Sequence, residues 1–99
     1  MKLQLLLLAL AASARAAQVS ITNLVFVPNP LTISSGSTVT WFNNDNEAHI
    51  VVSSSDIFNS GTISPGGTYS FTFADAGTYS YSDVLHPTMT GVIIVTSSP

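Results

Sequence analysis

The chain has 99 residues, a formal net charge of −3, two histidines and no cysteine. Its only basic residues are Lys2 and Arg15, so all charged residues beyond position 15 are acidic. Such a surface cannot neutralise phosphate groups, which argues against nucleic acid and anionic membranes as partners. It suits a partner with a basic surface, or solubility in an acidic or salty medium. The lack of cysteine excludes disulfides, a common means of stabilising small exported domains.

The N-terminal segment has the features of an export signal. Lys2 supplies a positive charge, residues 3–12 are almost wholly apolar, and Ala14-Arg15-Ala16 matches an A-x-A cleavage site. The apolar run of about ten residues is half of what a membrane-spanning helix requires. We therefore expect a signal peptide at 1–16 and a mature monomeric domain at 17–99, exported to the periplasm or the extracellular medium without a membrane span. A retained amphipathic anchor is the alternative.

After position 17, short β-branched and aromatic runs alternate with Gly, Pro, Asn and Ser, and helix signals are almost missing. In chain order, the predicted strands cover residues 19–27, 31–34, 38–43, 50–53, 68–73, 78–82 and 92–96. Residues 56–63 are compatible with a loop or a short edge strand. The pattern is typical of an all-β sandwich or barrel with one core.

Period-two alternation predicts which side chains face the interior. Residues 68–73 alternate as a half-buried strand does, and Tyr79 and Tyr81 share one face. Asp83 continues the parity of these tyrosines, so its carboxylate is expected at the interior or its rim. Because burial of an unpaired carboxylate is costly, we expect Asp83 to be neutral, hydrogen-bonded or bound to a cation. Trp41 is expected in the core.

Four side chains form a candidate set of metal ligands, namely His49, Asp83, His86 and Met89. The last three lie within one short segment, a spacing that suits a loop wrapped around one ion, while His49 would come from a distant strand end. Imidazole suits copper, zinc, iron and nickel; the thioether favours copper, and the carboxylate favours harder ions. Taken singly, each histidine could instead form a hydrogen bond in a polar turn, and Met89 could fill the core.

An ordered series of motifs resembles the plastocyanin, amicyanin and pseudoazurin branch of the cupredoxin family. The motifs are Phe26-Val27-Pro28, the segment at 36–43, His49, the segments at 65–69 and 77–81, and the segment at 86–91. This resemblance covers nearly all of 17–99. It implies a Greek-key β-sandwich, a copper ion held by two His, one Cys and an axial Met, and single-electron transfer.

The resemblance assigns His49 as the upstream ligand, His86 as the loop histidine and Met89 as the axial ligand, and it places Asp83 where the family has cysteine. Ile50 also departs from the family, since many members carry there a polar residue that supports the thiolate. A thiolate is soft and stabilises Cu(I), whereas a carboxylate is hard and favours Cu(II). We therefore predict a colourless or pale Cu(II) site that resembles a type 2 centre.

The favoured function is that of an exported copper-binding protein, active in electron transfer or copper handling and not an enzyme. One alternative is a small metalloenzyme, because two His and one carboxylate also suit Fe(II) or Zn(II), although no spare histidine or lysine is present as a general base. The other is a metal-free interaction or structural domain that keeps only the fold, in which Asp83 is a protonated or hydrogen-bonded rim carboxylate. Separately, Asp83 could be a deliberate replacement of cysteine in an engineered chain. The remaining acidic residues, Asp45, Glu47, Asp56 and Asp75, are expected to be solvated loop or turn residues.

Overall fold

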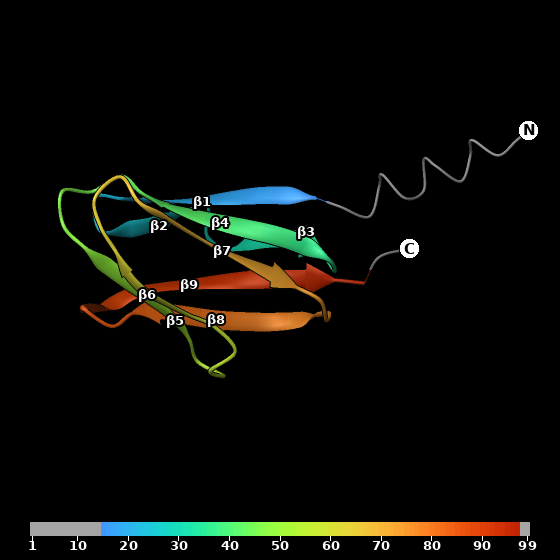
Figure 1. The fold of residues 1–99 in the computed structure, drawn as a ribbon. Helices are drawn as coiled ribbons and strands as arrows, with labels where there is room; N and C mark the ends of the chain where they lie inside the picture. Colours follow the sequence, from blue (N-terminus) through green and yellow to red (C-terminus); the bar gives the residue numbers. More distant parts are fainter. Residues whose placement is uncertain (1–14, 98–99) are drawn as a thin grey trace, which may run out of the picture.

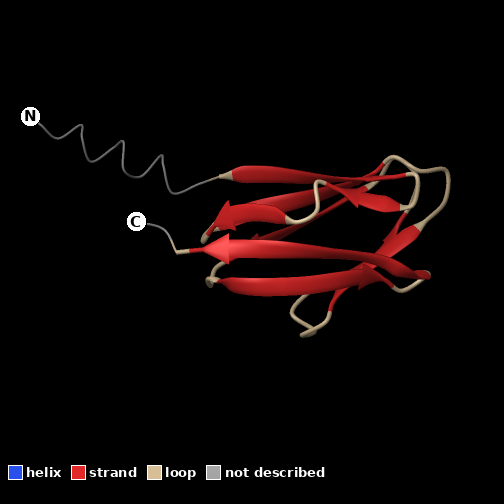
Figure 2. Cartoon of the chain, turned by 180° about the vertical axis from the view of Figure 1, so that it is seen from behind, coloured by secondary structure: helices blue, strands red, loops and turns tan. Residues whose placement is uncertain are grey.

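The computed structural model describes residues 15–97, which form two β-sheets stacked around one apolar core (Figure 1). The strands are β1 (Ala16–Thr22), β2 (Val25–Val27), β3 (Leu31–Ser34), β4 (Ser37–Asn43), β5 (His49–Ser53), β6 (Asn59–Ile63), β7 (Thr68–Phe73), β8 (Gly77–Asp83) and β9 (His86–Thr96). One sheet has the strand order β2-β1-β4-β7, and the other has the order β3-β9-β8-β5-β6. Figure 2 shows only strands and loops over the described residues. The predicted all-β sandwich is confirmed.

Each sheet combines one parallel pair of strands with antiparallel pairs. β1 pairs with β4 in parallel, and β3 pairs with β9 in parallel, whereas β4–β7, β5–β8 and β8–β9 are antiparallel. No helix in the described part of the chain is long and apolar enough to cross a membrane.

The expected signal peptide falls mostly outside the described residues, which begin at Arg15. The carbonyl of Arg15 accepts a hydrogen bond from the Thr38 N–H at 3.0 Å, and Ala16 opens β1 opposite Thr38. Cleavage after residue 16 would therefore remove the first residue of β1 and leave the remainder of its pairing with β4. The boundary at 16–17 stays a prediction.

The prediction of a single strand at 19–27 is wrong, because the chain turns back at Asn23 and Leu24. Their φ angles are 51° and 61°, a left-handed conformation that a strand does not adopt. The carboxylate of Asp45 accepts the N–H groups of Asn23 and Leu24 at 2.7 and 3.1 Å. A partner more than twenty positions away thus stabilises the turn between β1 and β2, and local propensity alone does not reveal it.

The segment that follows Asp83 also differs from the expectation. The sequence pattern predicts a loop here and a strand that begins at residue 92. Instead, Val84 and Leu85 form a tight turn, and β9 begins at His86. Asp83 and His86 therefore lie opposite each other at the end of the β8–β9 hairpin. The uncertain segment at 56–63 contributes β6, an edge strand of the five-stranded sheet.

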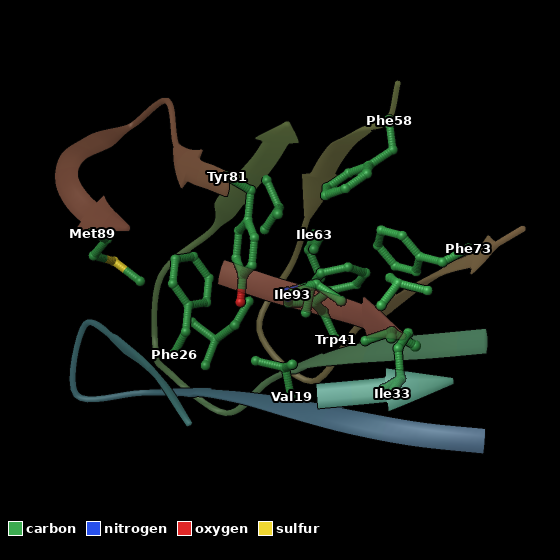
Figure 3. Packing of buried hydrophobic residues seen from close by; sticks show 14 residues of the cluster. Val19, Phe26, Ile33, Trp41, Phe58, Ile63, Phe73, Tyr81, Met89 and Ile93 are labelled. Carbon is green, nitrogen blue, oxygen red and sulfur yellow. The ribbon is translucent and has the colours of Figure 1, made fainter. Parts of the chain in front are cut away.

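The core is rich in aromatic side chains (Figure 3). Trp41 is fully buried, as predicted, and its ring meets that of Tyr81 edge-on at a centroid distance of 5.4 Å. Gly91 on β9 lies directly against Tyr81, since a Cβ atom at Gly91 would be 2.4 Å from the Tyr81 Cζ atom. The ring of Tyr81 and the missing side chain of Gly91 thus fit together across the β8–β9 pair.

Candidate metal centre

The sequence-predicted ligands lie at the end of the sandwich opposite to the start of β1 and the end of β9 (Figure 1). His49 is the first residue of β5, Asp83 is the last of β8, and His86 is the first of β9. β5 and β8 are antiparallel neighbours with Val51 opposite Asp83, and β8 is the neighbour of β9. Strand pairing therefore brings together two histidines and one carboxylate from three adjacent strand ends.

The donor atoms of these residues converge. His49, Asp83 and His86 each offer one ligand atom, and these atoms lie within 4.8 Å of one another. The Oδ2 atom of Asp83 forms a hydrogen bond with Nδ1 of His49 and lies 3.4 Å from Nδ1 of His86. The two imidazole rings have a centroid separation of 5.1 Å. Both Nδ1 atoms therefore face the same carboxylate oxygen.

The outer nitrogens of the two rings face two further carboxylates. Nε2 of His49 lies 3.0 Å from Oδ2 of Asp45, and Nε2 of His86 lies 3.0 Å from Oε1 of Glu47. Carboxylate and imidazole groups thus alternate in the order Asp45, His49, Asp83, His86 and Glu47. We call these five residues the acid–imidazole chain.

The expectation that Asp45 is a solvated loop residue is wrong, since its side chain is only 12% exposed and contacts His49. Glu47 is 56% exposed, as expected for a loop residue, yet it contacts His86. The position of Asp45 four residues before His49 was the available signal in the sequence, but only the folded loop shows that the two side chains meet. Burial alone would raise the pKa of Asp45; hydrogen bonds from the Leu24 N–H, His49 and the Asn23 N–H lower it below its ordinary value.

Asp83 is fully buried and well supplied with hydrogen-bond donors. Its Oδ1 atom accepts the N–H groups of Ile50 at 3.2 Å and Leu85 at 2.8 Å. Burial alone would raise the pKa of Asp83, but the Leu85 N–H and His49 act in the opposite direction, with further contributions from Ile50 and His86. The net effect holds the pKa of Asp83 below the ordinary value of 3.8. The expected hydrogen bonding of Asp83 is confirmed, and its binding of a cation stays a prediction.

Asn43, which the sequence pattern did not single out, organises the loop that carries Asp45 and Glu47. Its side chain is 1% exposed; Nδ2 donates to the carbonyls of Glu47 and Ile63 at 2.8 and 2.9 Å. Its Oδ1 atom accepts the N–H of Asp45 at 2.9 Å. A buried amide with three such bonds fixes the backbone on both sides of the loop.

Met89 lies on β9, three residues beyond His86, and its side chain is 5% exposed. It belongs to the apolar core cluster, and Figure 3 shows its thioether directed toward Phe26. Among the histidine and acidic side chains of residues 15–97, the converging donors are those of His49, Asp83 and His86.

Two imidazole nitrogens and one carboxylate oxygen fit Cu(II) and Zn(II), which accept borderline nitrogen and hard oxygen donors. The chemistry and convergence of the donor atoms thus suit a divalent ion at the end of a β-sandwich. This combination of fold and donor atoms is that of a small β-sandwich with a candidate metal site.

The chain belongs to the cupredoxin family, since the sequence model described as a cupredoxin-like domain matches residues 3–95. Plastocyanin from Scenedesmus fuscus is 41% identical over 69 residues, which cover 59% of this chain and 70% of that protein. Amicyanin from Paracoccus versutus is 32% identical over 87 residues, which cover 83% of this chain and 66% of that protein.

Solved structures agree with this assignment. An amicyanin variant with Cu(I) superposes with a TM-score of 0.76 at 29% identity, covering 81% of each chain. A purple cupredoxin from Nitrosopumilus maritimus gives a TM-score of 0.76 at 29% identity and covers 81% of this chain and 99% of that chain. The resemblance inferred from the ordered motifs is therefore confirmed. The present chain is related to copper proteins but contains no cysteine.

Proposed function

We propose that this chain is an exported copper-binding protein in which His49, Asp83 and His86 hold Cu(II). The observation that carries the proposal is the convergence of both Nδ1 atoms on Oδ2 of Asp83, with the three donor atoms within 4.8 Å of one another. Bound copper would supply a one-electron couple, which suits single-electron transfer or copper handling and requires no catalytic side chains. Met89 is proposed as a weak axial donor from β9.

The proposed site is not blue. The intense colour of cupredoxin copper arises from a cysteine thiolate, and the carboxylate of Asp83 offers a hard oxygen donor instead. A hard donor favours Cu(II) over Cu(I), so the reduction potential is expected to be lower than that of a thiolate site. The spectroscopic behaviour is expected to be that of a type 2 centre.

Titration of the metal-free mature protein with Cu(II) tests this proposal. We expect one Cu(II) per chain, only weak visible absorption, and an electron paramagnetic resonance spectrum with the hyperfine pattern of nitrogen and oxygen ligands. His86→Gln is the matched ligand variant, since His86 is partly exposed and its replacement leaves the core intact. A strong blue band, or equal Cu(II) affinity in the His86→Gln variant, would contradict the proposed ligand set.

The metal itself needs a separate test, because the same donors suit zinc and iron. Metal content after expression in a medium with balanced copper, zinc and iron distinguishes the proposed copper protein from a zinc or iron protein and from a metal-free domain. Cycling of the copper-loaded protein with a small electron donor then separates an electron carrier from a copper store. Reversible reduction supports the carrier.

Export is proposed from the N-terminal pattern of Lys2, the apolar run at 3–12 and Ala14-Arg15-Ala16. The intact mass of protein recovered from the periplasm or the medium tests it, with loss of residues 1–16 as the expected result.

The absence of basic residues beyond position 15 supports a redox partner with a basic surface. Binding to such a partner should weaken as the ionic strength rises.

A further inference from the structure

The acid–imidazole chain has outer members that the proposed ligand set does not use. Asp45 and Glu47 each lie 3.0 Å from the Nε2 atom of a proposed ligand histidine. We propose that these two carboxylates are positioning residues that make the site selective for a divalent ion over a monovalent one. The inference rests on the proposed metal site and extends it to the preferred charge of the ion.

The first step of the argument concerns the orientation of the rings. A metal-bound histidine commonly donates its other N–H to a carboxylate, which fixes the tautomer and makes the ring a stronger donor. Here the carboxylates of Asp45 and Glu47 lie beside Nε2 of His49 and His86. When Nδ1 of each ring binds a metal ion, the remaining proton lies on Nε2 and would be held by these carboxylates. Nδ1, on the side of Asp83, is left as the ligand atom.

The second step concerns charge. Asp45, Glu47 and Asp83 contribute three carboxylates around two imidazoles, and residues 15–97 contain only one basic side chain, at Arg15. The Coulomb energy between an ion and a fixed charge is proportional to the charge of the ion. Each outer carboxylate therefore stabilises a divalent ion about twice as strongly as a monovalent ion at the same position.

Glu47 offers the cleaner test of the two carboxylates. Its side chain is 56% exposed, so that substitution leaves no buried cavity. Asp45 also accepts the N–H groups of Asn23 and Leu24, and its replacement would disturb the β1–β2 turn as well as the site. Glu47→Gln keeps the shape and an acceptor oxygen but removes the charge, whereas Glu47→Ala removes both.

The experiment compares Cu(II) and Cu(I) affinities of the full mature chain by competition with chelators. We expect Glu47→Ala to lose about 10–100-fold in Cu(II) affinity, the usual effect of removing a carboxylate partner of a ligand histidine. The loss for Cu(I) should be about 3–10-fold, because the ion has half the charge. Glu47→Gln should change both affinities in the same direction but by less, since its amide oxygen still accepts the Nε2 proton.

These two losses also predict a change in reduction potential. The ratio of Cu(I) to Cu(II) affinity should rise about 3–10-fold. At 59 mV per tenfold change for one electron, this rise corresponds to an increase of about 30–60 mV in the reduction potential. Asp75→Asn is the matched control, because it removes one carboxylate from an exposed turn at the other end of β8. The Cu(II) and Cu(I) affinities of this control should each change less than twofold, because salt screens the interaction of the ion with a distant surface charge.

The outcomes separate this inference from the proposed function. If the wild-type chain binds Cu(II) and Glu47→Ala loses Cu(II) and Cu(I) affinity equally, Glu47 acts only on structure and the selectivity is refuted. Affinities in Glu47→Ala that match those of Asp75→Asn refute any role of Glu47. A wild-type chain that binds no Cu(II) overturns the proposed function and the present inference together.

Discussion

Asp83 and His49 are 34 positions apart in the sequence, yet Oδ2 of Asp83 contacts Nδ1 of His49 in a pair with both side chains fully buried. The pairing of β5 with β8 creates this contact, because it places Val51 opposite Asp83. The same oxygen faces Nδ1 of His86 across the β8–β9 hairpin. Position 83 therefore lies between both histidines, and in the proposed copper site its donor atom would decide whether the ion has a hard or a soft third ligand.

Replacement of Asp83 with cysteine should convert the protein into a blue copper protein. A thiolate at this position would restore a soft donor beside the two Nδ1 atoms and favour Cu(I) more than the carboxylate does. We expect an intense thiolate-to-copper absorption band after addition of Cu(II). Asp75→Cys is the control, since an exposed cysteine at a distant turn should give no such band. Binding of Cu(II) by Asp83→Cys without the band would show that position 83 does not correspond to the family's cysteine.

The metal-free protein should lose stability in acid. The pKa values of Asp83 and Asp45 are lowered in the folded state from the ordinary value of 3.8, so both groups bind protons more readily when unfolded. Their contribution to the free energy of unfolding is therefore present above that value and is lost as the pH falls through the folded pKa values. Urea unfolding between pH 7 and pH 2 should show a decline that begins below about pH 5. In the Asp83→Asn variant this decline should be smaller. A wild-type stability that rises as the pH falls from 7 to 2 would contradict the role of the two carboxylates.

Asn43→Ala should destabilise the fold and weaken metal binding together. The substitution removes a buried amide that bonds the carbonyls of Glu47 and Ile63 and the N–H of Asp45. We expect a loss of about 2–4 kcal/mol in the free energy of unfolding, because buried partners would be left unsatisfied. Asn46→Ala, in the same loop but exposed, should change it by less than about 0.5 kcal/mol. Equal effects of the two variants in urea unfolding would show that Asn43 does not organise the loop.

Gly91→Ala should be destabilising despite the small size of the added methyl group. The new Cβ atom would lie 2.4 Å from Cζ and 2.5 Å from Oη of Tyr81, a side chain that is 1% exposed and cannot move aside freely. The expected cost is about 1–3 kcal/mol by thermal or urea unfolding, the usual range for an overpacked core. Tyr81→Leu should reduce the cost of Gly91→Ala in a double-mutant cycle. Additive effects of the two substitutions would contradict the steric explanation.

Local periodicity was sufficient to predict the strands and their buried faces where strands run without interruption. The strand expected at 68–73 coincides with β7, and the interior face expected for Tyr81 and Asp83 is confirmed by their burial. Both predictions succeeded because side chains alternate between faces along any strand, whichever strand is its neighbour. The ordered motifs likewise sufficed to predict the family.

The amino-acid sequence by itself determined the all-β class, the absence of a thiol and the donor atoms available for a site. Only the tertiary structure decided that the chain turns back at Asn23 and Leu24, that His86 follows a tight turn, and that each histidine meets two carboxylates. The contacts of Asp45 with Asn23 and Leu24, and of Glu47 with His86, join positions 21 to 39 residues apart. Such contacts depend on strand order and on packing of the whole core, whereas the alternation of a single strand specifies only the face that a side chain occupies.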